Sequence, residues 1–425
     1  MDSGLRRNDG GLTNLVCTFA SAAARIIIEA GYAGRPATFI TDYPEAKMGW
    51  SSHHPVGLIY YAPQHCYRGY TLTANTRGGN HADLLDMEGR ICQRWHTEEG
   101  IGYAQLLPYG NLLIRTAPAE DAGGMEKIGG SSAAILELDW DSNIVWEYRN
   151  PIVHHDYERL LNGNTLVLQF GFLSPELTSQ IKGGMTSDED PEQMFGDQVQ
   201  EINPDGTVVY EWRSWEHLSP EDDAICPLED RVEWTHGNSL KVTPEGDLLV
   251  SYRRISVVGI VDRKSGDFRW KWGPGEISHP HHPTYLDNGN ILIFDNGFHR
   301  PRSCYSRVVE INPATNEVVW EYQGEPPLSF FSQATSSADR LPNGNTMICE
   351  GSPGRIFEVT PNKEIVWEYI NPFFTRGRPQ GGGSAPESIN SLLRAHRYGP
   401  DYPGLKGREL DPARYANLNR LYNGR

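Results

Sequence analysis

The chain has 425 residues, of which 38% are hydrophobic, and it contains 11 Trp, 20 Tyr and 44 Gly. This composition is too aromatic for a disordered chain and rich in turn formers, so it predicts a globular, turn-dense fold. The formal net charge of −17 repels phosphate backbones and anionic head groups. We therefore expect no nucleic-acid or membrane partner, and an anionic substrate would need a local basic pocket.

The first 45 residues read as an N-terminal extension, either a leader or a helix. Arg6-Arg7 followed by the stretch 12–24 loosely resembles an export signal, but residues 8–11 interrupt it with polar and glycine residues. The six cysteines contain no CxxC pair, and no segment reaches the roughly 20 apolar residues that cross a bilayer. We expect a soluble and cytoplasmic protein, with a homodimer left open.

A hairpin pattern recurs along the chain as two apolar runs around an x-Gly-Asn or x-Gly-Asp turn, a strong short-range signal for a β-hairpin. The copies are Leu106 to Leu113, Arg159 to Leu166, Val242 to Leu249, Tyr285 to Leu292 and Arg340 to Met347. Each is followed by an alternating apolar strand, a polar turn and a second strand containing a tryptophan. Two hairpins per unit predict a four-stranded antiparallel sheet.

The repeated tryptophans, together with a degenerate unit near the start, define six units. They are Trp95, Trp146, Trp212, Trp270, Trp320 and Trp367, spaced by 47 to 66 residues. That period is typical of propeller blades with loop insertions, so we predict an all-β, six-bladed β-propeller over residues 46–376. We interpret the repeated Trp as a residue that packs one blade on the next.

Three segments do not fit the repeat. Residues 171–197 and 214–231 are expected to be long surface loops, which could roof one end of the propeller. Residues 377–425 are expected to form a linker and a C-terminal extension. Within that extension, 377–384 reads as flexible and 387–396 as a short helix, so we predict a partly helical extension.

The blades should bring certain residues together at one mouth of the central channel. Counting nine residues back from the last turn residue of each hairpin gives one structural address, occupied by Gly102, His155, Asn238, His281 and Ser336. Because blades are related by rotation, equivalent positions form a ring. Neighbouring candidates are His154, Asp156, Tyr157, Trp234, His236, Arg253, His279, His282 and Thr335, with His299 after a strand that reaches the same end.

Two chemistries fit such a site. A neutral imidazole is a nucleophile toward electrophilic sulfur or phosphorus, with a second imidazole as general base and an Arg or Asn for the oxyanion. Alternatively, three or four imidazoles could ligate a transition metal. No HExxH motif is present, and we favour the reaction without a metal or other cofactor.

These motifs resemble the bacterial arylsulfotransferases, which move a sulfuryl group between phenols without a nucleotide sulfate donor. The resemblance spans roughly residues 55–400. It rests on His155-Asp156, Trp234-Thr235-His236-Gly237-Asn238-Ser239, Ser251-Tyr252-Arg253, and His281 ahead of Phe294-Asp295-Asn296-Gly297. It implies a six-bladed propeller, an aromatic substrate and, as an alternative to the cytoplasm, a periplasmic location.

Position by position, the resemblance implies that His281 is the nucleophile and is transiently sulfated. His236 and Asn238 would bind the sulfuryl oxygens, Arg253 would neutralise their charge, and His155 would be the acid/base or orienting group. The remaining candidates, expected to line the substrate site, are His154, Tyr157, Trp234, His279, His282, His299 and Thr335. A one-residue slip would put His282 in place of His281.

The chain departs from the family in lacking a convincing export signal and in carrying extra histidines at 154, 279 and 282. Two other functions therefore stay open. One is a lyase or hydrolase that uses His, Tyr and Arg on the same scaffold, because one propeller can host unrelated chemistries. The other is a binding propeller without catalysis.

Overall fold

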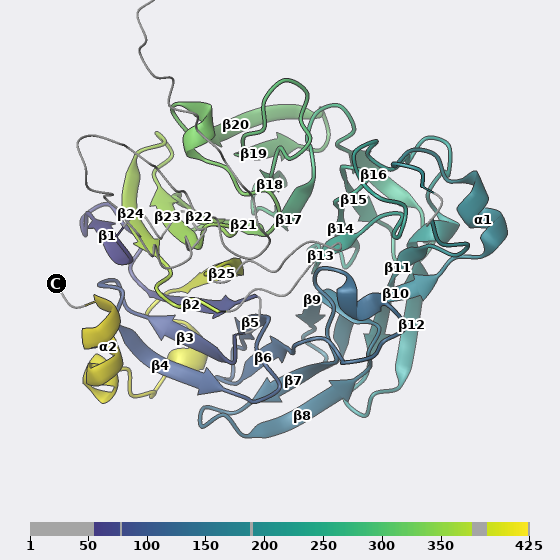
Figure 1. Cartoon of the computed structure of the whole chain (residues 1–425). Helices are drawn as coiled ribbons and strands as arrows, with labels where there is room; N and C mark the ends of the chain where they lie inside the picture. Colours follow the sequence, from purple (N-terminus) through teal and green to yellow (C-terminus); the bar gives the residue numbers. More distant parts are fainter. Residues whose placement is uncertain (1–54, 77–78, 188–189, 376–388, 424–425) are drawn as a thin grey trace, which may run out of the picture. The chain divides into compact units, whose positions relative to one another are not determined.

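Six antiparallel sheets surround a common axis in the computed structural model, which describes residues 55–76, 79–187, 190–375 and 389–423. The predicted six-bladed β-propeller is confirmed (Figure 1). The N-terminal extension and the predicted linker over 377–384 lie outside the described residues. In the described part of the chain, no helix is long and apolar enough to span a bilayer.

The blades are numbered here in chain order, with strands given from the axis outward. Blade 1 holds β25 (Leu392–Tyr398), β2 (Tyr70–Asn75), β3 (His81–Leu85) and β4 (Ile91–His96); blade 2 holds β5 (Tyr103–Leu106), β6 (Leu112–Arg115), β7 (Ala134–Leu138) and β8 (Ile144–Arg149). Blade 3 holds β9 (Val153–Arg159), β10 (Thr165–Phe172), β11 (Phe195–Ile202) and β12 (Val208–Arg213).

Blade 4 holds β13 (Gly237–Val242), β14 (Leu248–Tyr252), β15 (Val257–Val261) and β16 (Phe268–Trp272); blade 5 holds β17 (Pro280–Tyr285), β18 (Ile291–Asp295), β19 (Arg307–Asn312) and β20 (Glu317–Gln323). Blade 6 holds β21 (Ser336–Arg340), β22 (Thr346–Glu350), β23 (Arg355–Val359), β24 (Ile365–Ile370) and, outermost, β1 (Gly57–Tyr61). The two α-helices among the described residues are α1 (Pro175–Gln180) and α2 (Ala416–Asn423).

The predicted hairpins join the first and second strands of blades 2 to 6. Their central glycines, Gly110, Gly163, Gly246, Gly289 and Gly344, have φ between 84° and 95°. Glycine adopts this left-handed conformation without a steric penalty, and such tight turns need it. The turn chemistry therefore sets the register of the two innermost strands, which carry the candidate site residues.

The ring of blades is closed by both ends of the described chain. Strand β25 pairs with β2 as the innermost strand of blade 1, and β1 pairs with β24 at the outer edge of blade 6. The helix predicted over 387–396 is therefore wrong, because Leu392 to Tyr398 alternate between two buried surfaces as an extended strand. The C-terminal extension is partly helical, as predicted, but its helix is α2, further along the chain than the predicted one.

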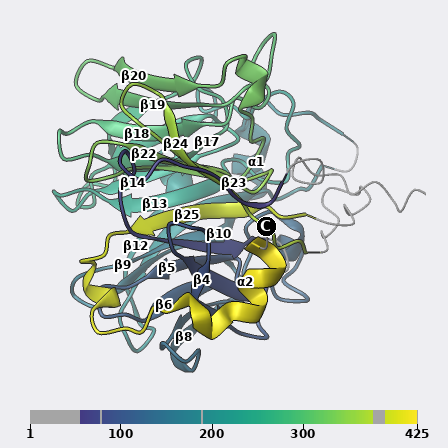
Figure 2. The same ribbon diagram turned by 90° about the vertical axis from the view of Figure 1, so that its left-hand side faces the viewer.

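The C-terminal segment covers the outer strand of blade 1. Asn419 accepts a hydrogen bond from the backbone N–H of Ile91 at 2.7 Å, and the Tyr415 hydroxyl accepts one from that of Arg94 at 3.1 Å. Figures 1 and 2 both show α2 beside β4. Because an uncovered edge strand exposes unpaired backbone groups, this segment protects an edge that would otherwise pair with other chains.

Each of the six repeated tryptophans bonds to the next blade, as their packing interpretation predicts. The indole N–H groups of Trp95, Trp146, Trp212, Trp270, Trp320 and Trp367 donate to Asp139, Pro204, Gly266, Asn316, Pro361 and Met87 at 2.8 to 3.1 Å. Every acceptor lies in the turn between the third and fourth strands of the following blade. The bond from Trp367 to Met87 joins blade 6 to blade 1 and completes the circle.

Replacing Trp367 by Phe should lower the free energy of unfolding by about 1–3 kcal/mol, because the buried Met87 carbonyl would lose its donor. The matched change Trp320→Phe should cost less than about 1 kcal/mol, because water can reach the exposed Pro361 carbonyl. Urea unfolding of both variants measures the difference. Equal losses would show that burial of this bond is unimportant.

Candidate functional site

The four predicted catalytic residues lie together at one end of the channel. His155 lies on β9 and His281 on β17, while His236 directly precedes β13 and Arg253 directly follows β14. The His155 and His236 rings are 4.6 Å apart, centroid to centroid. Burial, Arg253 and His236 hold the pKa of His281 well below its usual range. The address counted from the hairpin turns therefore identified residues that meet in space.

The tautomer of His281 is fixed by Asn296, which directly follows β18. The Asn296 amide N–H₂ donates to the Ser332 and Ala334 carbonyls at 2.7 and 2.9 Å, so its oxygen must face the imidazole. That oxygen accepts from His281 Nδ1 at 2.8 Å. Because burial lowers the pKa of His281, the ring is neutral at pH 7 and its Nε2 carries a lone pair.

His236 is oriented by a carboxylate. Its Nδ1 lies 3.0 and 2.9 Å from the two oxygens of Glu233, three residues earlier. An ionised carboxylate can only accept, so Nδ1 carries the proton and Nε2 is directed away from Glu233. A carboxylate on Nδ1 stabilises the imidazolium that forms when Nε2 takes up a proton. His236 thus has the surroundings of a proton-transfer group.

His155 is held by a chain of polar groups. Its Nδ1 lies 3.0 Å from His154 Nδ1, and His154 Nε2 lies 3.1 Å from Asp197 Oδ1. Asp197 accepts from the backbone N–H of Gly237 at 2.7 Å. His154 Nε2 thus contacts the Asp197 carboxylate, although not in hydrogen-bond geometry, and Nδ1 is hydrogen-bonded to His155. Because His154 is fully buried behind His155, its position favours an orienting role over the predicted substrate contact.

Gly130 supports His155 from the other side. A Cβ atom on Gly130 would lie 2.2 Å from His155 Cε1, and its φ of 84° also disfavours any other residue. The backbone N–H of His155 donates to the Gly130 carbonyl at 2.8 Å. The loop that contains Gly130 therefore sets the depth of the imidazole in the channel.

Arg253 supplies the positive charge of the site. Its Nη1 donates to Glu229 at 2.8 Å, and its guanidinium carbon lies 5.9 Å from the centre of the Phe298 ring. Burial lowers the pKa of Arg253, but Glu229 opposes that shift, so the group remains a cation. Nε and Nη2 have no hydrogen-bond partner among the described residues and are available to an anion.

Glu229 belongs to the second predicted loop insertion, which therefore reaches the site. Although burial favours the acid form, the hydrogen bond from His279 and the charges of Arg253 and Arg254 hold the pKa of Glu229 well below its usual range. The first insertion carries α1, which lies at the periphery of the propeller (Figure 1). Each predicted insertion thus contributes one carboxylate to the site: Asp197 at the end of the first and Glu229 in the second.

Strand irregularities aim these histidines. His155, His236, His279, His282 and His299 all have φ between 45° and 62°, a left-handed conformation that is uncommon outside glycine. The register of the first two strands shifts at the same places in blades 3, 4 and 5. Such bulges re-aim side chains, and backbone strain of this kind gathers at functional sites.

The bulge in β17 explains why both His281 and His282 point inward. His282 lies deeper in the channel than His281. Its Nδ1 is 3.9 Å from Asp339 Oδ1, and its ring centroid is 5.7 Å from that of His396. Burial, followed by Arg394, keeps its pKa well below the usual range. The two imidazoles thus face different levels of the channel, and only His281 lies beside Asn296.

A buried ion pair crosses the axis below the site. Arg394 on β25 donates to Asp156 on β9 at 2.7 Å and to the Asn238 carbonyl at 2.8 Å. The Asn238 amide N–H₂ donates to the Pro280 carbonyl at 2.8 Å. The structure therefore uses one of the two amide N–H groups of Asn238 to hold the residue before His281, and the predicted contact with a sulfuryl oxygen rests on the second.

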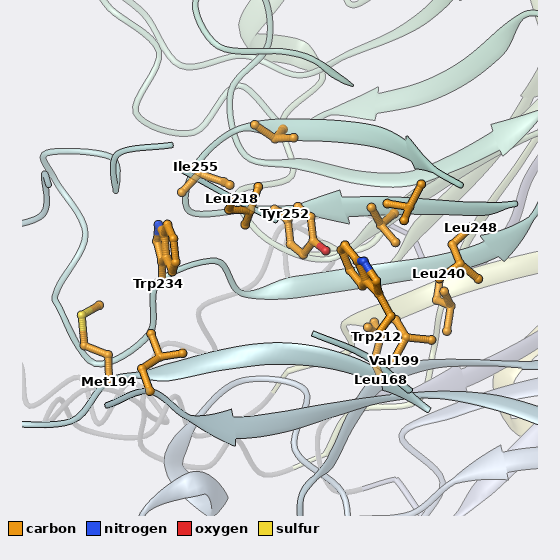
Figure 3. Close-up of a cluster of buried hydrophobic side chains, with 14 of the residues drawn as sticks. Leu168, Met194, Val199, Trp212, Leu218, Trp234, Leu240, Leu248, Tyr252 and Ile255 are labelled. Carbon is orange, nitrogen blue, oxygen red and sulfur yellow. The ribbon is translucent and has the colours of Figure 1, made fainter. Parts of the chain in front are cut away.

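Tyr157 and Trp234 lie in the core, which corrects their predicted substrate contacts. The Tyr157 hydroxyl donates to the Leu113 carbonyl at 2.6 Å, and the Trp234 indole donates to the Asp223 carbonyl at 2.8 Å. Both side chains are fully buried, and Trp234 packs in the cluster drawn in Figure 3. Thr335 is half-buried, and its hydroxyl has no partner among the described residues.

His279 and His299 form a second group with Cys226 beside Arg253. His279 Nε2 lies 3.0 Å from Glu229, and His299 Nδ1 lies 3.4 Å from Cys226 Sγ. Their ligand atoms lie within 4.8 Å of one another, close enough to hold a metal ion. Both histidines border the predicted site rather than line its centre.

Sequence reasoning missed the groups that orient the histidines. Asn296 lies in the quoted motif Phe294-Asp295-Asn296-Gly297 but was given no role, and Glu233 could have been found from its three-residue spacing to His236. The other groups are Asp197, Glu229 and Arg394. They come from other strands or loops, and no motif or spacing in the sequence links them to the histidines. Only the folded ring brings them to the imidazoles.

Six blades around a buried group of imidazoles and one guanidinium define a propeller of the sulfotransferase-like class. The arylsulfotransferase (ASST) family model matches residues 122–372, more than half of the chain. The protein therefore belongs to the arylsulfotransferase family, as its motifs predict. No curated protein matches the chain.

Solved structures are similar to the chain at low sequence identity. A protein of unknown function from Bacteroides caccae has a TM-score of 0.50 and 14% identity, covering 77% of this chain and 98% of that chain. A streptogramin B lyase has a TM-score of 0.43 and 15% identity, covering 81% and 93%. Hydrazine synthase from Kuenenia stuttgartiensis has a TM-score of 0.40 and 11% identity, covering 68% and 76%.

Acidification should destabilise the protein through its buried histidines. Burial holds the pKa of His155, His281 and His282 well below the unfolded value of about 6.5. Below pH 6.5 the unfolded chain binds protons that the folded chain does not. The stability that these neutral rings allow is therefore fully present above about pH 6.5 and is lost as the pH falls below that value. Urea unfolding between pH 7.5 and pH 5.5 should show the loss.

The variant His282→Gln removes one of the three buried histidines. It should reduce the slope of the unfolding free energy against pH by up to about 1.4 kcal/mol per pH unit below pH 6.5. His96→Gln, which changes an exposed side chain, is the control and should keep the wild-type slope. A slope unaffected by His282→Gln would contradict the assignment of a neutral buried ring.

Proposed function

We propose that the protein transfers a sulfuryl group from an aryl sulfate to a phenol through a sulfohistidine at His281. The observation that carries the proposal is the Asn296 amide, whose fixed orientation leaves His281 Nε2 unprotonated beside Arg253. A neutral imidazole nucleophile and a cation for the transferred group are what this reaction needs. Family membership supports the same class of reaction.

In the first half-reaction, His281 Nε2 attacks the sulfur of the aryl sulfate. The sulfur–nitrogen bond forms as the bond between sulfur and the aryl oxygen breaks, and the phenolate leaves with that electron pair. Protonated His236 gives its Nε2 proton to the phenolate. Asn296 accepts from Nδ1–H throughout, so it stabilises the positive charge on the sulfated ring.

In the second half-reaction, an acceptor phenol gives its proton to His236 Nε2 as its oxygen attacks the sulfur. The sulfur–nitrogen bond breaks, and its electron pair returns to His281. Arg253 would neutralise the sulfuryl oxygens in both transition states. The geometry favours His236, with Glu233 on its Nδ1, for proton transfer, and it favours His155 for packing and orientation beside it.

In this proposal the aryl group lies at the edge of the site. The partly exposed Phe298 ring lies next to Arg253, so its exposed part would contact the aryl group while the guanidinium meets the sulfate. His155 and His281 are each only 4% exposed, so the reacting sulfate would be largely shielded from water. Removal of water strengthens the electrostatic interactions of the reacting group.

The primary test combines 4-nitrophenyl sulfate with a second phenol. Wild-type protein should release nitrophenol and form the new aryl sulfate, and intact-protein mass spectrometry without acceptor should show one added sulfuryl group. His281→Ala should abolish both signals, whereas His282→Ala should retain the covalent adduct. Release that persists in His281→Ala, or an unsaturated product without acceptor, would contradict the proposal and favour another reaction.

The orienting role of Asn296 predicts a large kinetic effect without loss of the nucleophile. Asn296→Leu removes the acceptor that fixes the Nδ1–H tautomer, so kcat/KM should fall by about 10²-fold or more. Nitrogen NMR of labelled histidine should show loss of the Nδ1–H form of His281. The control Asn390→Leu changes a buried amide that donates to the Asn371 carbonyl, and it should leave the tautomer unchanged.

A further inference from the structure

Three loops bring a thiol and two imidazoles together beside the proposed sulfuryl site. Cys226 lies in the second insertion, His279 directly precedes β17, and His299 follows β18. Their ligand atoms lie within 4.8 Å of one another. Because the three residues are far apart in sequence, this cluster exists only in the folded chain.

Their spacing is close to that of a tetrahedral metal site. Zinc–nitrogen bonds of about 2.0 Å and zinc–sulfur bonds of about 2.3 Å place neighbouring donor atoms roughly 3.3–3.6 Å apart. Cys226 Sγ lies 3.4 Å from His299 Nδ1. Glu229 Oε1 lies 3.0 Å from His279 Nε2 and 3.8 Å from His299 Nδ1, so it offers a fourth donor.

The hydrogen bonds of His279 leave one position to be filled by a positive charge. The Ser278 hydroxyl donates to the Phe298 carbonyl, so it must accept from His279 Nδ1, which lies 3.1 Å away. A neutral imidazole has only one N–H group. Its Nε2 then faces a carboxylate oxygen of Glu229 at 3.0 Å, a position that a proton fills when His279 donates to Glu229 and that a metal cation can take instead.

The hydrogen bond on the ring nitrogen of His279 that points away from the cluster matches that of metal-binding histidines. A ligating imidazole usually donates its second ring N–H to an oxygen, which fixes its tautomer. Ser278 provides that oxygen for His279. The His279 and His299 rings meet nearly at right angles, with centroids 4.8 Å apart, so their nitrogens can approach one ion from different directions.

The local charge balance also accommodates a divalent ion. Arg253 contacts Glu229, and Arg254 contacts Asp230 and Glu233, so two guanidinium groups face three carboxylates. A zinc ion bound with loss of the Cys226 proton would change this net charge from −1 to zero. A thiolate and two imidazoles prefer zinc over calcium or magnesium, which take oxygen ligands.

We propose that Cys226, His279, His299 and Glu229 bind one zinc ion. The ion would tie the second insertion and the β18–β19 loop to the start of β17. Through the His279 carbonyl, which lies 3.3 Å from His281 Nδ1, it would help to position the proposed nucleophile. This role is structural, and zinc binding does not depend on the proposed sulfuryl transfer.

The test measures metal on the full chain after removal of any affinity tag. Wild-type protein loaded with zinc and passed through a desalting column should retain one zinc per chain. Cobalt(II) should replace it and give a near-ultraviolet thiolate charge-transfer band with an intense visible band of tetrahedral geometry. Added zinc should raise the melting temperature of the wild-type chain, because it binds the folded state.

Cys226→Ser and His299→Ala should each weaken zinc binding by about 10-fold or more and remove the zinc-dependent rise in melting temperature. Cys226→Ser should also remove the thiolate band, while the control Cys304→Ser, a change at another partly buried free thiol, should retain it. The proposal would be overturned if the wild-type chain retained no zinc, or if both ligand variants retained as much zinc as the wild-type chain. Neither readout requires sulfuryl transfer, so failure of one proposal leaves the other testable.

Discussion

The structure depends on a circle of six indole N–H groups, each bonded to a turn of the following blade. Within a blade, continuous ladders of backbone hydrogen bonds hold the strands, whereas backbone bonds between blades are isolated ones, such as that from His155 to Gly130. The tryptophans link neighbouring blades with a large apolar surface and a directional bond in one side chain. Because the last bond returns from Trp367 to blade 1, the angle of each blade is constrained by all the others. A site built from single residues of several blades needs that constraint.

The site itself is built where the regular strand is interrupted. Five histidines adopt left-handed backbone conformations, and three inner strands change register beside them. A regular strand sends successive side chains to opposite faces, so it could not direct neighbouring imidazoles into one channel. Polar partners then orient the rings: Asn296 for His281, Glu233 for His236, and His154, which contacts Asp197, for His155. Rigid blades and irregular inner strands thus have complementary roles.

Much of this arrangement could be predicted from the sequence because the repeat is local. The glycine turns fix the register of each inner hairpin, so a fixed count from the turn reached both His155 and His281. The same count could not reach Arg394, because the innermost strand of blade 1 comes from the distant C-terminal segment, which was expected to be helical. The orienting carboxylates were also out of reach, since Asp197 and Glu229 contact histidines of other blades or loops. The predicted substrate contacts of Tyr157 and Trp234 rest on adjacency alone. The register shift in β9 separates Tyr157 from His155, Trp234 precedes β13, and both side chains are buried in the core.

Closure by the two ends of the described chain has a consequence for synthesis. Strand β25 contributes Arg394, whose guanidinium is the partner of the fully buried Asp156 carboxylate more than two hundred residues earlier. A ribosome releases that strand after the other described strands of the ring, so the first blade waits with an open inner edge while the other five are completed. Pairing across so long a separation is slow, and unpaired strand edges invite aggregation in the interval. The nascent chain therefore acquires its central ion pair and its closed ring in the same late event, and a prematurely terminated product would lack both.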